Sequence, residues 1–166
     1  MMLILLFAVA VLSIGLMVAV PVWQTQIQRE QEKELIFRGK QYVEAIRIFQ
    51  NKYPGTFPQR LEELLQEKCI RRLYTDPMSL SGEWNVILLH PQSTSRQGTS
   101  FQKVIVASKS DIESLDQPQI IGVVSSSDKK SKKIYIKQET YNKWLFYFGQ
   151  DPETMPEIVY FSQMED

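Results

Sequence analysis

Residue types that commonly perform catalysis or bind transition metals are sparse in this chain of 166 residues. His90 is the only histidine and Cys69 the only cysteine, so these two residues alone cannot form a zinc site or a histidine-based catalytic triad. A single cysteine also excludes an intramolecular disulfide. We interpret His90 as an ordinary surface residue at a strand end and Cys69 as a small buried hydrophobe.

Carboxylates offer the remaining chemistry. Asp76, Glu83, Asp151, Glu153 and Glu157 could supply oxygen ligands to calcium, but they lack the spacing of an EF-hand loop. No paired carboxylates for hydrolysis and no phosphate-binding glycine loop stand out. The sequence therefore predicts no enzyme, no cofactor, no metal site and no nucleotide site, with calcium binding left open as an alternative.

Charge is balanced overall, with 19 basic and 19 acidic residues, so no global field directs the chain to nucleic acid. The main local excess is a basic run formed by Lys129, Lys130, Lys132 and Lys133. A solvated hairpin loop is the simplest interpretation of this run. The alternative is a surface that docks to an acidic partner.

The elements that position the side chains discussed above follow an uncharged N-terminal segment. This segment covers residues 1–23 and reads MMLILLFAVAVLSIGLMVAVPVW. A membrane-spanning helix needs about 20 apolar residues. Ser13 can bond to a carbonyl one turn earlier, Trp23 suits the membrane interface, and Pro21 predicts a bend. We predict an uncleaved transmembrane helix, because the run has no basic start and is longer than the apolar region of a signal peptide.

The orientation of this span conflicts with its flanking charges. Arg29, Lys33, Arg38 and Lys40 follow the span, and no basic residue precedes it. The positive-inside rule taken alone would place the following domain in the cytoplasm.

The helical pattern continues without a break through residues 24–53, as a neck and a head-packing half. Residues 24–34 are polar nearly all round, and Glu34 and Arg38 are spaced to form a favourable pair. An apolar stripe then predicts packing on a sheet, and its glycine predicts a close approach by another element. The helix is expected to end near Tyr53-Pro54-Gly55. The stripe consists of Leu35, Ile36, Gly39, Tyr42, Val43, Ile46, Phe49 and Tyr53, of which Ile36, Gly39, Val43, Ile46 and Phe49 are the predicted helix–sheet packing residues.

Residues 54–149 are expected to form a small α+β head, followed by an acidic surface tail over residues 150–166. A capping-box pattern at Thr56–Gln59 predicts a short helix with the inner face Leu61, Leu64 and Leu65. Short loops favour an antiparallel meander whose apolar face covers the stripe. Residues 141–148 could form a last strand or a short helix. The strand candidates are Trp84–Leu89, Lys103–Ala107, Gln119–Ser125 and Lys133–Lys137, separated by loops at 92–100, 108–118 and 126–132.

This order of elements, together with several local phrases, resembles type IV pilins and a branch of type II secretion pseudopilins. The phrases are QREQEKELIFRGKQY at 28–42, LEELL at 61–65, RRLYTDPM at 71–78, GEW at 82–84, IIGVVSSSDKKSKK at 120–133 and YNKW at 141–144. The resemblance implies a long N-terminal helix packed on a small antiparallel sheet, and a structural subunit in the bacterial inner membrane with a periplasmic head.

The resemblance also implies partners and an assembly surface. Such subunits join other pilin-like subunits and an inner-membrane platform, with their first helices bundled at the core of a short filament. The residues that would form this membrane and filament core are Leu3, Leu6, Phe7, Ala10, Ile14, Met17 and Pro21. Precursors in the family carry a basic leader ending in glycine and, in most members, an early glutamate, which are not found here. We expect the natural start to lie upstream; the alternative is an unprocessed, divergent subunit.

A second functional hypothesis remains beside this one. The chain could be a single-pass, membrane-anchored extracytoplasmic binding domain that does not polymerise. An anchored enzyme is a weaker third hypothesis, because no set of titratable groups suggests a catalytic pocket.

Overall fold

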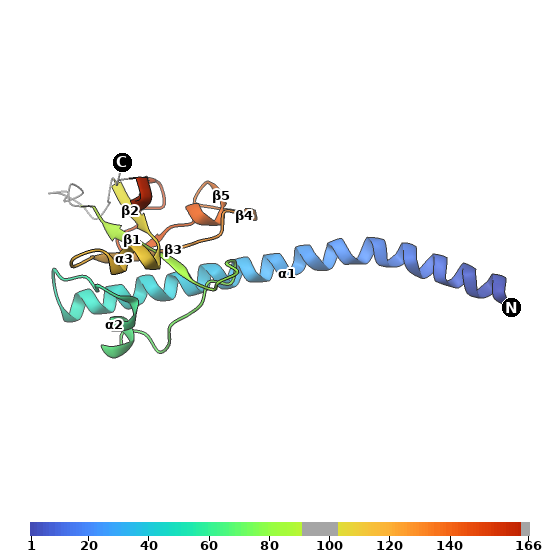
Figure 1. Cartoon of the computed structure of the whole chain (residues 1–166), viewed down its shortest axis with the longest axis horizontal. Coiled ribbons are helices and arrows are strands. Elements are labelled where there is room, and N and C mark those ends of the chain that lie inside the picture. The colour runs from blue at the N-terminus through green and yellow to red at the C-terminus, as the bar shows by residue number, and fades with distance from the viewer. Residues whose placement is uncertain (91–102, 164–166) are drawn as a thin grey trace.

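The computed structural model describes residues 1–90 and 103–163, with the side chains of residues 15–22 outside that description. The fold is α+β: one long N-terminal helix, a mixed five-stranded sheet, a separate two-stranded hairpin and short helices. The sheet and the short helices gather along the C-terminal half of the long helix, whereas the N-terminal half projects away from them (Figure 1).

Helix α1 (Met2–Lys52) has the extent that the sequence predicts. Its end is defined by the Tyr53 N–H, which donates to the Phe49 carbonyl at 2.8 Å, and by Gly55, whose φ of +83° leaves the helical region. Two expected local interactions are confirmed. Ser13 Oγ donates to the Val9 carbonyl at 2.8 Å, and Glu34 pairs with Arg38 at 2.8 Å.

The five-stranded sheet has the order β6-β3-β1-β2-β7. Its strands are β1 (Trp84–Leu89), β2 (Lys103–Ala107), β3 (Ile120–Ser125), β6 (Phe146–Tyr147) and β7 (Glu157–Tyr160). Pairs β1–β2, β1–β3 and β3–β6 are antiparallel, but β2–β7 is parallel. The expected antiparallel meander is therefore wrong: β3 returns to the far side of β1 instead of pairing with β2. The expected surface tail over residues 150–166 contributes the edge strand β7.

The connection between β2 and β3 contains helix α3 (Lys109–Glu113), where the sequence predicted a loop. A reciprocal capping box begins it, because Ser108 Oγ accepts from the Asp111 N–H and Asp111 Oδ2 accepts from the Ser108 N–H at 2.8 Å. This helical turn provides the length that lets the chain cross from one side of β1 to the other.

Helix α2 (Leu61–Gln66) begins later than the capping-box pattern at Thr56–Gln59 predicts. Arg60 occupies the N-cap position without a side-chain cap, and the carbonyl of Pro58 accepts from the Ile120 N–H at 2.9 Å. Pro58 is thus tied to β3 and lies outside the helix. Of the three leucines expected to face inward, Leu64 is buried, Leu61 is half-buried and Leu65 is exposed.

A separate hairpin is formed by β4 (Lys130–Tyr135) and β5 (Gln138–Thr140). The basic run was expected in a loop, but three of its four lysines lie in β4. The 3-10 helix η2 (Tyr141–Lys143) follows, and β6 comes after it, so residues 141–148 form both a short helix and a strand. The last element is the 3-10 helix η3 (Phe161–Gln163).

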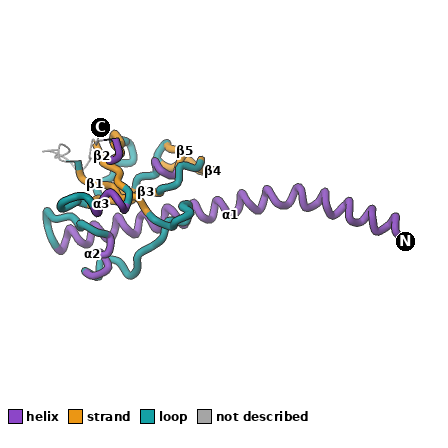
Figure 2. Tube along the Cα trace, in the orientation of Figure 1, coloured by secondary structure: helices purple, strands orange, loops and turns teal. Residues whose placement is uncertain are grey.

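The main core lies between α1 and the sheet, and α2 covers α1 from the opposite side (Figure 2). Aromatic rings fill much of it: Trp84 packs edge-on against Tyr42 at 5.9 Å and against Phe146 at 6.4 Å. Two further clusters cover other parts of the sheet, one of them beneath α3. The apolar stripe of α1 therefore forms one wall of the main core, as a sheet-packing helix requires.

Candidate functional site

The most unusual surface of the molecule is the N-terminal half of α1. Leu3, Leu6, Phe7 and Ile14 each expose between 63% and 82% of their surface, and Ala10 is also exposed. Neighbouring residues 4 and 5 are exposed to a similar degree, so every side of the helix is bare here. The other two predicted assembly residues, Met17 and Pro21, lie outside the described side chains. Taken over the described residues alone, none of the helices combines the length and apolarity that crossing a membrane requires.

The C-terminal half of α1 is covered along one side. Ile46 and Phe49 are buried in the main core, and Ile36 and Val43 are half-buried at its margin. The stripe stops at Phe49, because Tyr53 remains 40% exposed and donates a hydrogen bond from its hydroxyl to Glu67 Oε2. Side chains near the start of the helix are therefore exposed, whereas those on one side of its C-terminal half are buried in the head.

Gly39 is the point of closest approach between α1 and the sheet. A Cβ placed on Gly39 would lie 2.4 Å from the ring of Phe146, the first residue of β6. The predicted close approach at this glycine is thereby confirmed. Gly122 on β3 has the same relation to β6, since its Cβ would lie 2.2 Å from the Phe146 carbonyl oxygen. The two glycines thus let β6 approach both α1 and its neighbouring strand β3 closely.

A buried polar cluster joins α1 to the hairpin. Glu32 is fully buried, and its Oε1 accepts hydrogen bonds from the Lys132 N–H at 2.6 Å and from the Tyr141 hydroxyl at 2.9 Å. Gln28 Nε2 donates to the Tyr141 hydroxyl at 2.8 Å and to the Lys130 carbonyl at 3.3 Å. Burial raises the pKa of Tyr141 to about 12; the hydrogen bond from Gln28 lowers it and Glu32 raises it further. We call Gln28, Glu32 and Tyr141 the junction cluster.

The junction cluster was missed at the level of sequence. The polar residues 24–34 predict a neck between membrane and head, or a stretch packed against neighbouring subunits. Glu32, however, lies three residues before Leu35 and seven before Gly39, in phase with the buried stripe. That phase was the available signal. Its second oxygen, Oε2, is buried with no hydrogen-bond partner among the described residues, so the site is not fully satisfied.

The carboxylates considered for calcium do not come together. Asp76 is buried and holds a turn: its Oδ2 accepts from Ser125 Oγ at 2.7 Å and from the Ser126 N–H at 3.2 Å, and its Oδ1 accepts from the Met78 N–H at 2.8 Å. Glu83 pairs with Lys109 and Glu157 with Lys103, while Asp151 caps its own turn. Over the described residues, no three His, Cys, Asp or Glu side chains are grouped to hold a metal ion.

The other chemically interesting residues have structural surroundings. Cys69 is buried, which raises the pKa of its thiol and fits the small hydrophobe that was predicted. Trp84 and Trp144 are buried core residues, and His90 is half-buried just after β1.

One hollow of about 230 Å³ lies between α2, α3 and β1, with Tyr42, Tyr74 and Trp84 among its lining residues. Pockets for drug-sized ligands measure roughly 300–1,000 Å³, so this one is small. Its polar floor is already paired: the Tyr74 carbonyl accepts from the Trp84 indole N–H and from the Tyr42 hydroxyl, both at 2.9 Å. The hollow therefore gives little support to a ligand-binding role.

Comparison with known proteins gives no relative from which a function could be transferred. No protein-family model matches the chain, and neither a curated protein nor a solved structure matches it.

Proposed function

We propose that this chain is a structural, pseudopilin-like subunit, held in the bacterial inner membrane by residues 1–23, with its head on the periplasmic side. It assembles through α1 with other pilin-like subunits on an inner-membrane platform, forming a short envelope-spanning filament for type II protein secretion. The observation that carries the proposal is α1 itself, a single helix of 51 residues. Its apolar side chains from Met2 to Ile14 are exposed, and its second half is the wall of a folded head.

The bare half needs an apolar environment. Soluble monomers rarely expose contiguous apolar patches larger than a few hundred Å². At 1.5 Å per residue, the stretch from Met2 to Trp23 is about 33 Å long, close to the roughly 30 Å of a bilayer's hydrocarbon core. Lipid before assembly, and neighbouring helices after it, would both supply the missing contacts.

Assembly, as opposed to simple anchoring, is supported by the sequence resemblance and by the undivided helix. One continuous helix joins the head to the first segment, so no loop separates the two. A lone anchored binding domain would more naturally present a ligand site. Of two hollows beside Trp84, the one of about 230 Å³ has its polar floor already paired, and the other, of about 470 Å³, is a shallow polar surface hollow.

Disulfide cross-linking in native membranes tests the proposal. Single cysteines replace Leu3, Phe7, Ala10 and Ile14 in a Cys69→Ala background, and Gln66→Cys, on the exposed side of the head, reports random collision. An assembling subunit gives disulfide-linked dimers from the single α1 cysteines, and ladders of trimers and higher species only when two of these cysteines are combined in one chain. Both products disappear when the proposed partner subunits are deleted. Monomers only, or dimers no more frequent than with Gln66→Cys, would instead favour the lone anchored domain.

A further inference from the structure

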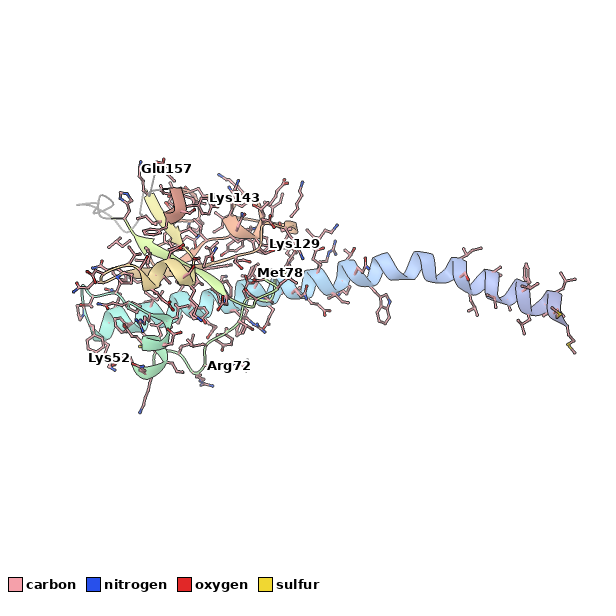
Figure 3. The ribbon with its side chains drawn as sticks, viewed as in Figure 1. Lys52, Arg72, Met78, Lys129, Lys143 and Glu157 are labelled. Atoms are coloured by element: carbon pink, nitrogen blue, oxygen red, sulfur yellow. The ribbon has the colours of Figure 1, made fainter. Side chains whose placement is uncertain are left out.

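The hairpin lies where the head meets the projecting half of α1. Gln28 Nε2 reaches the Lys130 carbonyl, and Glu32 Oε1 accepts from the Lys132 N–H, so β4 is fixed beside this stretch of helix. Trp23 precedes Gln28 by five residues and Glu32 by nine, which places these contacts about 8 and 14 Å along the axis from Trp23. Figure 3 shows Lys129 at the end of the head that faces the projecting helix, with Lys52 and Glu157 toward the other end.

This end of the head is basic. Lys129, Lys130, Lys132 and Lys133 are all exposed on the hairpin. Lys130 pairs with Glu139 at 2.9 Å, but both side chains are more than half exposed and the pair is weak in water. Within the described residues, the ammonium groups of the other three lysines form no ion pair. Arg29 and Lys33 are exposed on α1, each one position after a residue that contacts the hairpin, so they flank this contact. The exposed acids Asp128 and Glu30 offset part of this charge, and the basic residues remain in excess.

The hairpin also exposes an apolar side chain among these lysines. Tyr135 of β4 stacks against Trp144 and Phe146, with ring centroids 5.4 Å apart in each case, which anchors the strand to the core. Neighbouring side chains of a strand point to opposite faces, so Ile134 points away from that core and is 70% exposed. Amphipathic helices that bind anionic membranes combine basic and apolar side chains, and the hairpin presents the same two kinds of side chain on a strand.

We propose that the hairpin docks on anionic phospholipid headgroups of the membrane that holds α1. The docking rests on the proposed anchor, because an apolar run ending at Trp23 would set the membrane surface about 8–14 Å from the hairpin backbone. Flexible lysine side chains cover much of that distance. Surface potential decays over about 8 Å at physiological ionic strength, so the lysines would lie within its range. The junction cluster holds the hairpin in this position.

The docking gives the unassembled subunit a fixed orientation. A rod embedded only by its first half can tilt and rotate, whereas a second, electrostatic contact beside the rod restrains both motions. The junction cluster supplies the rigidity, because Glu32 and Gln28 link the hairpin to the same helix that enters the membrane. Leaving the membrane for a filament would then require these lysines to release the headgroups.

The test uses the full chain in protein-free vesicles, with an environment-sensitive fluorophore on Ile134→Cys in the Cys69→Ala background. Vesicles are made from phosphatidylcholine alone or with about one third phosphatidylglycerol. We expect access of a neutral aqueous quencher to the fluorophore to fall roughly threefold in the anionic vesicles at low salt, and to recover at about 1 M salt. A fluorophore on Gln66→Cys should remain accessible in both vesicles.

A matched pair of variants separates the hairpin from overall charge. Lys132→Gln with Lys133→Gln should restore quencher access, whereas Lys40→Gln with Lys68→Gln, an equal charge change elsewhere, should not. Co-flotation with phosphatidylcholine vesicles is measured on the same samples. A chain that floats but whose Ile134 site is equally accessible in both vesicles overturns the docking and leaves the anchor standing. A chain that does not float overturns both. If the fluorophore on Ile134→Cys is protected from the quencher in native membranes but not in vesicles, the hairpin binds an acidic protein and the lipid proposal is overturned.

Discussion

At the scale of single residues, the junction cluster is the feature that connects the head to the exposed end of α1. Glu32 is the only fully buried acidic residue in the described part of the chain, and it contributes two accepted hydrogen bonds that join segments 100 and 109 positions away in sequence. Hydrogen bonds to buried carboxylates are among the stronger ones in proteins. Glu32 therefore helps to fix the hairpin, together with the Gln28 contact and the stacking of Tyr135.

We predict that Glu32→Ala destabilises the head by about 3 kcal/mol, because the Lys132 N–H and the Tyr141 hydroxyl lose their acceptor inside the protein. Glu32→Gln should cost less, since the amide oxygen can still accept both bonds. Urea unfolding of the full chain in detergent, followed by near-ultraviolet circular dichroism, measures both effects. Glu30→Ala, an exposed neighbour, should stay within about 0.5 kcal/mol of wild type. If Glu32→Ala lowers the free energy of unfolding no more than Glu30→Ala does, the role of the cluster is contradicted.

Buried tyrosines predict a loss of stability at alkaline pH. Burial raises the pKa of Tyr42, Tyr141 and Tyr147 from 10.0 to about 12 in the folded protein. Below pH 10 both states keep these protons and the stability is fully present. Between about pH 10 and pH 12 the unfolded chain releases them first, so stability falls with rising pH, by up to roughly 1 kcal/mol per tyrosine and pH unit.

The measurement is the urea midpoint across this alkaline window, with Tyr147→Phe as the comparison. The variant lacks one of the three tyrosines whose pKa is raised by folding, so its urea midpoint should fall less steeply with pH than that of the wild type. A midpoint that stays flat between about pH 10 and pH 12 would show that these hydroxyls are not buried as described.

At the scale of elements, the sequence predicted the bounds of individual helices and strands better than the order of the strands in the sheet. The bounds of α1, β1 and β2 follow from the local periodicity that sequence analysis reads. The sheet order does not, because pairing of β3 with β1 instead of β2 depends on non-local packing and on the helical turn α3 in between. The four residues of β7 are hidden in an acidic, proline-containing segment, where only the parallel pairing with β2 identifies them as a strand.

The contact between α1 and β6 gives a prediction at this scale. Gly39→Ala should gain about 1 kcal/mol from helix propensity and lose more from the clash with the Phe146 ring, for a net cost of about 1–2 kcal/mol. In a Phe146→Leu background the cost should shrink, so a double-mutant cycle reports a coupling between the two positions. Lys40→Ala, an exposed neighbour on α1, is the control. Additive effects of Gly39→Ala and Phe146→Leu would contradict the close approach.

At the scale of the whole molecule, the two halves of α1 have different surroundings, and the sequence anticipated this division. The uncharged run over residues 1–23 and the stripe from Leu35 to Phe49 were both visible as patterns. The junction between them was not, because the polar residues 24–34 gave no apolar signal and Glu32 is buried by a hairpin about 100 residues further along the chain. Local periodicity cannot reveal that a polar residue is buried by a segment far away in the sequence.

The most direct test of the central claim is the topology of the full chain in intact cells. Cysteines at Leu6 and Gln66, each alone in the Cys69→Ala background, are treated with a membrane-impermeant maleimide after the outer membrane is permeabilised. The account predicts rapid labelling of Gln66→Cys and none of Leu6→Cys until the membrane is dissolved in detergent. Labelling of Gln66→Cys only after the cells are lysed would place the head in the cytoplasm. Equal labelling of both positions in intact cells would mean that the first half of α1 is not in the membrane at all.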